Sequence, residues 1–101
     1  MTHADALFSI TRSLWDRLSA DIRGVAYLLG ESTLAVRFML ANEPDEMRLG
    51  MISDAETECI ADFWQTHHVS YIAEHLPSHL PRVLRPGERW VIVRYEPPLS
   101  V

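Results

Sequence analysis

The 101-residue sequence contains no lysine, a single cysteine and no long apolar run. The lone Cys59 excludes an internal disulfide and every paired-cysteine zinc or redox motif, which favours a reducing compartment. The longest apolar stretch, Val25 to Leu29, is far shorter than the roughly 20 residues of a membrane span. Because no basic start precedes an apolar run between Met1 and Trp15, we expect no signal peptide and a cytoplasmic protein.

Two common signatures of enzymes are also missing: a Gly-rich phosphate loop and a GxSxG nucleophile elbow. The composition is otherwise that of a globular domain, with 48% hydrophobic and 23% charged residues, and predicts one domain over residues 1–101. Fourteen acids against nine bases give a formal net charge of −5. A negative domain repels phosphate backbones, so we expect no direct nucleic-acid or membrane binding, and a basic protein as partner.

Hydrophobic periodicity predicts two amphipathic helices. The first spans Ala4 to Ala20, because its apolar residues recur at helical spacing. These residues are Leu7, Ile10, Leu14 and Leu18. The second spans about Asp45 to Trp64, because Pro44 and the acids beside it favour a helix start. Its apolar face carries Ile52, Ala55, Cys59 and Phe63.

Four further segments have the composition or the alternation of strands. They are Ile22 to Leu29, Leu34 to Leu40, Val69 to Ala73, and Trp90 to Tyr95. Gly30 is predicted to give a positive φ in a hairpin turn between the first two, and prolines make residues 77–88 a loop. This order predicts an α+β fold, an antiparallel sheet of about four strands with both helices on one face. The alternation places Tyr27, Arg37 and Arg94 on the other face.

Acidic residues concentrate around the second predicted helix. Residues 43–62 hold seven acids and one base, a formal charge of −6. Like charges four residues apart repel by about 0.2 to 0.5 kcal/mol per pair, which a cationic partner would relieve. The candidate partner-binding residues are Glu43, Asp45, Glu46, Asp54, Glu58 and Asp62. The alternative is that this stripe is only the solvated face of the helix.

The histidines invite a metal-site interpretation, which their spacing opposes. His75 and His79 would share a helix face, but Pro77 lies between them and interrupts the helix. We therefore predict no metal site, and solvated loop positions for all four histidines of this region: His67, His68, His75 and His79.

Several other residues invite functional interpretations that packing explains better. Cys59 shares the apolar face of the second helix, so we expect it in the core and not as a nucleophile. Glu56 falls on the same apolar arc, which predicts an arginine or backbone partner for its carboxylate. Trp64, Trp90 and Tyr95 are expected at the core or its margin, with partner anchoring as the alternative. No catalytic residue is predicted.

Several segments of the sequence have residue patterns similar to those of a known family. They are Asp21 to Tyr27, Leu34 to Phe38, Asn42 to Glu46, Ser53 to Phe63, the Leu80-Pro81 loop, and Trp90 to Glu96. The most distinctive piece is Thr57 to Phe63, followed by a proline loop and a strand with Trp, Tyr and Arg. In these pieces the chain resembles small bacterial immunity proteins of the contact-dependent growth inhibition type.

The resemblance implies a non-catalytic inhibitor that binds the C-terminal domain of a cognate toxin, often a nuclease acting on transfer RNA, and needs no cofactor. It agrees with the acidic composition, because a nuclease that grips phosphates presents a basic surface. We expect a monomer or weak dimer when the protein is alone. Two alternatives stay open: a small hydrolase using acids with a histidine such as His68, and a regulatory subunit that oligomerises through the hairpin edge.

Overall fold

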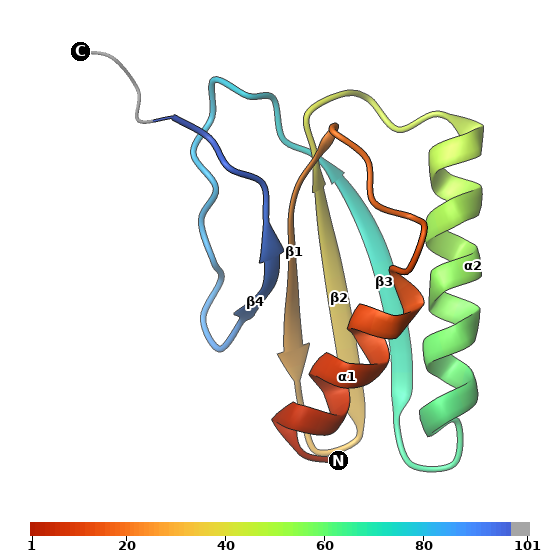
Figure 1. The fold of residues 1–101 in the computed structure, drawn as a ribbon. Coiled ribbons are helices and arrows are strands. Elements are labelled where there is room, and N and C mark those ends of the chain that lie inside the picture. Colours follow the sequence, from red (N-terminus) through yellow and green to blue (C-terminus); the bar gives the residue numbers. More distant parts are fainter. Residues whose placement is uncertain (98–101) are drawn as a thin grey trace.

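The computed structural model describes residues 1–97, which form two helices and four strands (Figure 1). In chain order these are α1 (His3–Ser13), β1 (Ile22–Leu29), β2 (Thr33–Leu40), α2 (Glu46–Phe63), β3 (His68–His75) and β4 (Arg89–Val93). The predicted α+β class is confirmed. The last four residues of the predicted domain 1–101 lie outside the described residues. Within residues 1–97, neither helix has the length and apolarity needed to cross a bilayer.

The sheet has the strand order β3-β2-β1-β4 and is mixed. β1 runs antiparallel to β2 and β4, but β2 and β3 are parallel, so the prediction of a wholly antiparallel sheet is wrong at this pair. The cause is the length of α2. Its 18 residues span roughly 27 Å, about the length of an eight-residue strand, and so return the chain to the end where β2 began.

The glycine of the β1–β2 turn serves a different purpose from the predicted one. Gly30 does not have a positive φ; among the glycines of residues 1–97, Gly87 does, at 83°. A Cβ at Gly30 would lie 2.6 Å from Thr33 Oγ1, and the Gly30 amide donates to the Thr33 carbonyl at 2.8 Å. The close approach of the Thr33 side chain, and not an unusual backbone angle, therefore favours glycine here.

Both helices cover one face of the sheet, and the core lies between them and that face (Figure 1). β2 contributes alternate residues, as predicted: Leu34, Val36, Phe38 and Leu40. Tyr27 also lies in this core, where its hydroxyl is 2.8 Å from Nδ1 of His3, so its predicted placement on the other face is wrong. A β-bulge between Ile22 and Gly24 shifts the phase of β1 and turns Tyr27 inward.

The opposite face of the sheet is covered by the loop between β3 and β4. Arg37 projects from this face, as predicted, and is only 4% exposed. Its Nη2 lies 2.7 Å from Glu88 Oε1 and donates to the Val83 carbonyl at 3.0 Å, and its Nη1 lies 3.2 Å from Glu74 Oε1. The hydrogen bond from Arg37 is the main reason that the pKa of Glu88 lies below its usual range. This guanidinium therefore ties the loop to the sheet.

A second buried arginine, Arg23 at the bulge, holds the segment after β4. It makes two hydrogen bonds of 2.9 Å to the carboxylate of Glu96. Arg82 and Arg94 approach the same carboxylate at 3.3 and 2.8 Å. These contacts, with Arg23 the largest, lower the pKa of Glu96 to about 2.

Replacing Glu96 by glutamine is expected to remove an acid-sensitive part of the stability, about 1 to 2 kcal/mol near neutral pH. The folded pKa lies below the ordinary 4.5, so this stabilisation is present above that value and is lost as the pH falls toward about 2. Urea unfolding of wild type and Glu96→Gln should therefore converge on acidification. Glu31→Gln, in the exposed turn, is the matched control. If the difference in unfolding free energy between wild type and Glu96→Gln did not change with pH, the proposed role of the arginines around Glu96 would be contradicted.

Candidate partner-binding site

Two of the six acidic candidates form ion pairs with residues of α1 or the turn after it. Arg17 Nη1 lies 2.6 Å from Glu58 Oε2, and Arg12 Nη2 lies 2.5 Å from Asp62 Oδ2. The Ser9 hydroxyl also donates to Asp62 at 2.5 Å, and this bond together with Arg12 keeps the pKa of Asp62 below its ordinary value. The repulsion expected along the acidic stripe is thus relieved in part by the chain's own arginines.

The other four candidates are exposed at or near the N-terminal half of α2. Asp45 caps the helix through its side chain, and Glu46 occupies the first turn. Glu43 precedes the helix, and its Oε2 lies 3.3 Å from Nδ1 of His75. Asp54 and Glu46 form no ion pair with any residue of the described part of the chain. Glu46 and Asp54 therefore leave acidic charge without an ion-pair partner among the described residues on the solvent side of α2.

α1 ends at Ser13 and not at Ala20, because a tertiary contact stops it. Asp16 has a φ of 62°, a left-handed conformation that aspartate tolerates better than most residues. Arg17 Nη1 donates to the Ser13 carbonyl at 2.8 Å, so the guanidinium that pairs with Glu58 also caps α1. Leu18 consequently leaves the helical face on which the sequence placed it.

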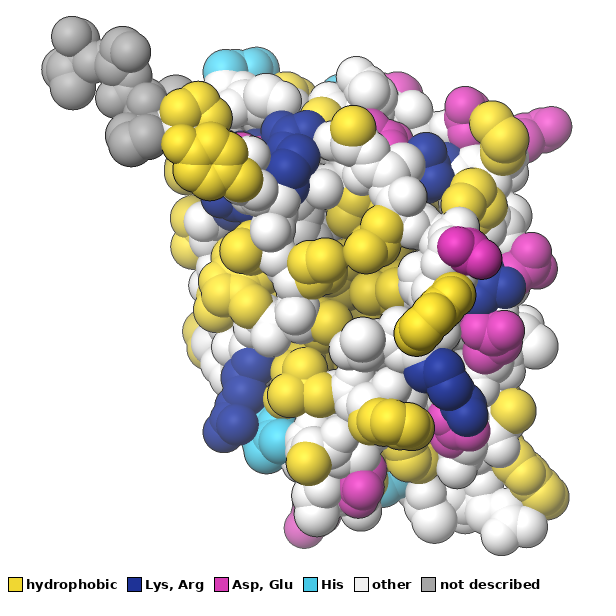
Figure 2. Space-filling model, in the orientation of Figure 1, with side chains coloured by type: hydrophobic (Ala, Val, Ile, Leu, Met, Phe, Trp, Pro, Cys, Tyr) yellow, Lys and Arg dark blue, Asp and Glu magenta, His cyan; other side chains and the backbone are white. Residues whose placement is uncertain are grey.

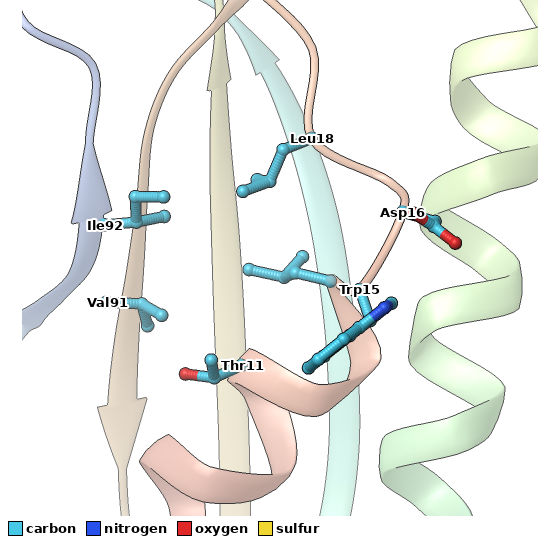
Figure 3. A pocket seen from close by; sticks show the side chains of 7 residues that line it. Thr11, Trp15, Asp16, Leu18, Val91 and Ile92 are labelled. Carbon is cyan, nitrogen blue, oxygen red and sulfur yellow. The ribbon is translucent and has the colours of Figure 1, made fainter.

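This early end opens an apolar groove between α1 and β4, on the helix-covered side of the sheet (Figure 3). The groove has a volume of about 510 Å³ and is lined by Thr11, Leu14, Trp15, Asp16, Leu18, Val91 and Ile92. In the close view, Val91 and Ile92 reach from β4 toward the side chains of α1 and the turn after it. Trp15 is 76% exposed and Leu18 is 49% exposed. Sequence reasoning missed this groove.

Trp15 also joins the groove to the acidic helix. On its other side it lines a second hollow together with Arg12, Glu58 and Ala61. Figure 2 shows the result as a strip of apolar atoms along the middle of this face, with acidic and basic side chains beside it over α2. One partner surface can therefore cover the apolar groove and the charged helix together.

The sequence model of the MafI2 immunity protein family matches residues 3–96, a range that includes both helices and all four strands of the described fold. The chain belongs to the MafI2 immunity protein family. The resemblance to bacterial immunity proteins is thereby confirmed, and the family supports a function in immunity to a toxin. That the toxin belongs to a contact-dependent growth inhibition system stays a prediction. A comparison with curated proteins finds no match.

The histidines of this MafI2-family chain are partly misplaced by the sequence prediction. His68 and His75 are the first and last residues of β3 and not loop residues, because the strand is longer at both ends than its apolar centre. His67 and His79 lie outside the strands, as expected. Within residues 1–97, no group of three or more His, Cys, Asp or Glu side chains is placed to hold a metal ion.

The two unusual residues on the apolar face of α2 are structural, as predicted. Cys59 is fully buried, with its Sγ 3.4 Å from the Ser9 hydroxyl oxygen. Glu56 accepts a hydrogen bond of 2.7 Å from the backbone amide of Tyr71. β3 is an edge strand of the sheet, so the Glu56 carboxylate satisfies an amide that has no strand partner on that side.

The predicted core-margin position is wrong for two of the three C-terminal aromatic residues. Trp64 is 68% exposed at the end of α2, and Tyr95 is 86% exposed beyond β4. Trp64 follows the last residue of α2, and Tyr95 lies after the last residue of β4, so neither side chain is covered by a neighbouring element. Trp90 is half-buried, and its ring would lie 2.8 Å from a Cβ at Gly24.

Proposed function

We propose that this immunity protein neutralises its toxin by stoichiometric, non-catalytic binding, and that the toxin domain is a basic nuclease that cleaves RNA, with transfer RNA as the substrate class. The observation that carries the proposal is the acidic charge left on α2 after the internal ion pairs are formed. A nuclease holds phosphates with cationic side chains, and an acidic surface competes for the same groups. Because such a toxin acts on cytoplasmic RNA, we place the protein in the cytoplasm.

The proposed toxin-facing surface contains the six acids in two roles. Glu46 and Asp54 carry charge with no ion-pair partner among the described residues, and Glu43 and Asp45 lie exposed before the helix. Glu58 and Asp62 reach the partner as part of pairs with arginines. A standard interface buries roughly 1,600 Å² in total and reaches nanomolar affinity when complementary charge adds to a few buried anchors. Occlusion at that affinity requires no metal, nucleotide or turnover.

Neither alternative gains support from a specific contact. A hydrolase needs an acid and a histidine at a common cleft, and the closest such pair is Glu43 with His75, whose Glu43 side chain is almost wholly in solvent. The hairpin edge proposed for oligomerisation does not exist, because β1 and β2 are the central strands and each is paired on both sides. Association through that edge is therefore wrong, whereas the oligomeric state of the protein stays a prediction.

Titration of the protein against its toxin is expected to abolish cleavage of transfer RNA near one molar equivalent, because occupancy is the whole mechanism. We expect the toxin to be encoded beside this chain, and the probe is the purified C-terminal domain of that toxin. Protection should be the same with or without a chelator, and a toxin domain from another system should stay active. Protection far below one equivalent would mean that the toxin is being modified. Undiminished cleavage of transfer RNA with this protein in excess over the toxin would reject the proposed function.

A further inference from the structure

We propose that the groove between α1 and β4 is an anchor site, which receives an apolar side chain projecting from the basic surface of the toxin. The inference rests on the proposed function, because it assigns this groove to the same partner. The family and the acidic residues of α2 suggest toxin binding in general, and this inference adds a specific contact to it.

The shape of the groove suits an inserted side chain. Its volume of about 510 Å³ falls within the roughly 300 to 1,000 Å³ of sites that enclose small ligands. Leu14 is almost fully buried, so the lining is continuous with the core, whereas Trp15 and Leu18 stand largely in solvent. An apolar group that enters would remove both exposed side chains from water.

One residue of the lining, Trp15, is of a type that often dominates the binding energy of protein interfaces. Hot spots are enriched in tryptophan and lie in pockets that become dry on binding. Trp15 belongs to that class, and it stands at the centre of the proposed surface because it lines both the groove and the hollow beside Glu58. Contacts of the surrounding charged residues would then exclude water from it.

Charge decides which partner the groove fits. Asp16 is the one carboxylate in the lining, and the acid that lies beyond Trp15 is Glu58, which pairs with Arg17. A second copy of the chain would bring its own net charge of −5 and the same acids against this rim, where like charges oppose association. A cationic protein is complementary to this net negative charge and to Asp16, so the occupant is the toxin and not another copy.

The test measures affinity for the same toxin domain by titration calorimetry. Trp15→Ala is expected to weaken binding about 30-fold or more, as hot-spot truncation does. Thr11→Trp, which fills the groove from the exposed side of α1, should weaken it to a similar extent. Trp64→Ala is the matched control, since Trp64 is also largely solvent-exposed, at 68%, but lies outside the groove. It should change affinity by less than about threefold.

Fluorescence gives a second readout that does not depend on loss of affinity. The emission of wild-type protein should shift to shorter wavelength on adding toxin, and Trp15→Phe should lack this shift while still binding.

Normal binding of both groove variants to a toxin that wild type neutralises would overturn this inference and leave the function intact. Failure of wild type itself to bind would overturn the function as well. A change in the sedimentation of the isolated groove variants, with toxin affinity unaltered, would assign the groove to self-association and also overturn the inference.

Discussion

Replacing Arg37 by alanine is expected to lower the free energy of unfolding by about 3 to 5 kcal/mol. The arginine is buried together with Glu88, and both hold the loop between β3 and β4 against the sheet. Without the guanidinium, the covered Glu88 carboxylate loses its ion-pair partner and the Val83 carbonyl loses its donor. A cost of this size approaches the total stability of many small domains.

Two further variants separate the buried pair from ordinary surface charge, with urea unfolding as the measurement. Arg85→Ala removes an exposed arginine that pairs with the neighbouring Glu74 at 2.8 Å, and should cost less than about 1 kcal/mol. The double variant Arg37→Met with Glu88→Gln should recover much of the loss, because it leaves no unpaired charge. If Arg37→Ala cost no more than Arg85→Ala, the loop would be held by something else.

Charge reversal on α2 is expected to slow association with the toxin by about 100-fold at low ionic strength. The variant combines Glu46→Arg and Asp54→Arg, because these acids form no internal ion pair in the described structure and their removal leaves Arg12 and Arg17 paired. Electrostatic attraction between the two proteins speeds their encounter and depends on their summed charges, so the association rate should also depend less on salt concentration. Stopped-flow mixing over a range of salt concentrations measures both effects.

A single-site comparison tests whether position or only net charge matters. Asp54→Arg and Glu31→Arg change the net charge equally, but Glu31 lies in the exposed β1–β2 turn. Asp54→Arg should slow association more than Glu31→Arg. Equal slowing by the two single variants would assign the effect to overall charge. If the double variant had the association rate and the salt dependence of wild type, α2 would be excluded from the interface.

Local signals in the sequence predict α2 and the hairpin almost to the residue. Asp45 caps α2 and Trp64 ends it, the two residues that the acidic start and the apolar spacing indicated. β2 follows its alternation because one of its faces is buried under the helices. These elements are determined by residues close to one another along the chain, so a single sequence carries the information.

The missed features depend on contacts between distant residues. Leu18 has helical spacing, but Arg17 stops α1 through Ser13 and a pair with Glu58 that lies far along the chain. The direction of β3 follows from the length of α2, which periodicity does not convert into strand order. The groove likewise brings Trp15 beside Ile92. For the same reason the sequence indicates the acidic candidates but not the pairing of Glu58 and Asp62 with arginines.

The position of β4 in the sheet has a consequence for the newly made chain. The hairpin, α2 and β3 form from neighbouring segments, whereas β4 must return across about 60 residues to pair with β1, a slow closure with a high entropic cost. Until Val93 has been synthesised and docked, β1 has an unpaired edge and the groove lacks the wall made by Val91 and Ile92. If that groove anchors the toxin, a nascent chain binds the toxin more weakly than the folded protein, and full immunity begins only when β4 has joined the sheet.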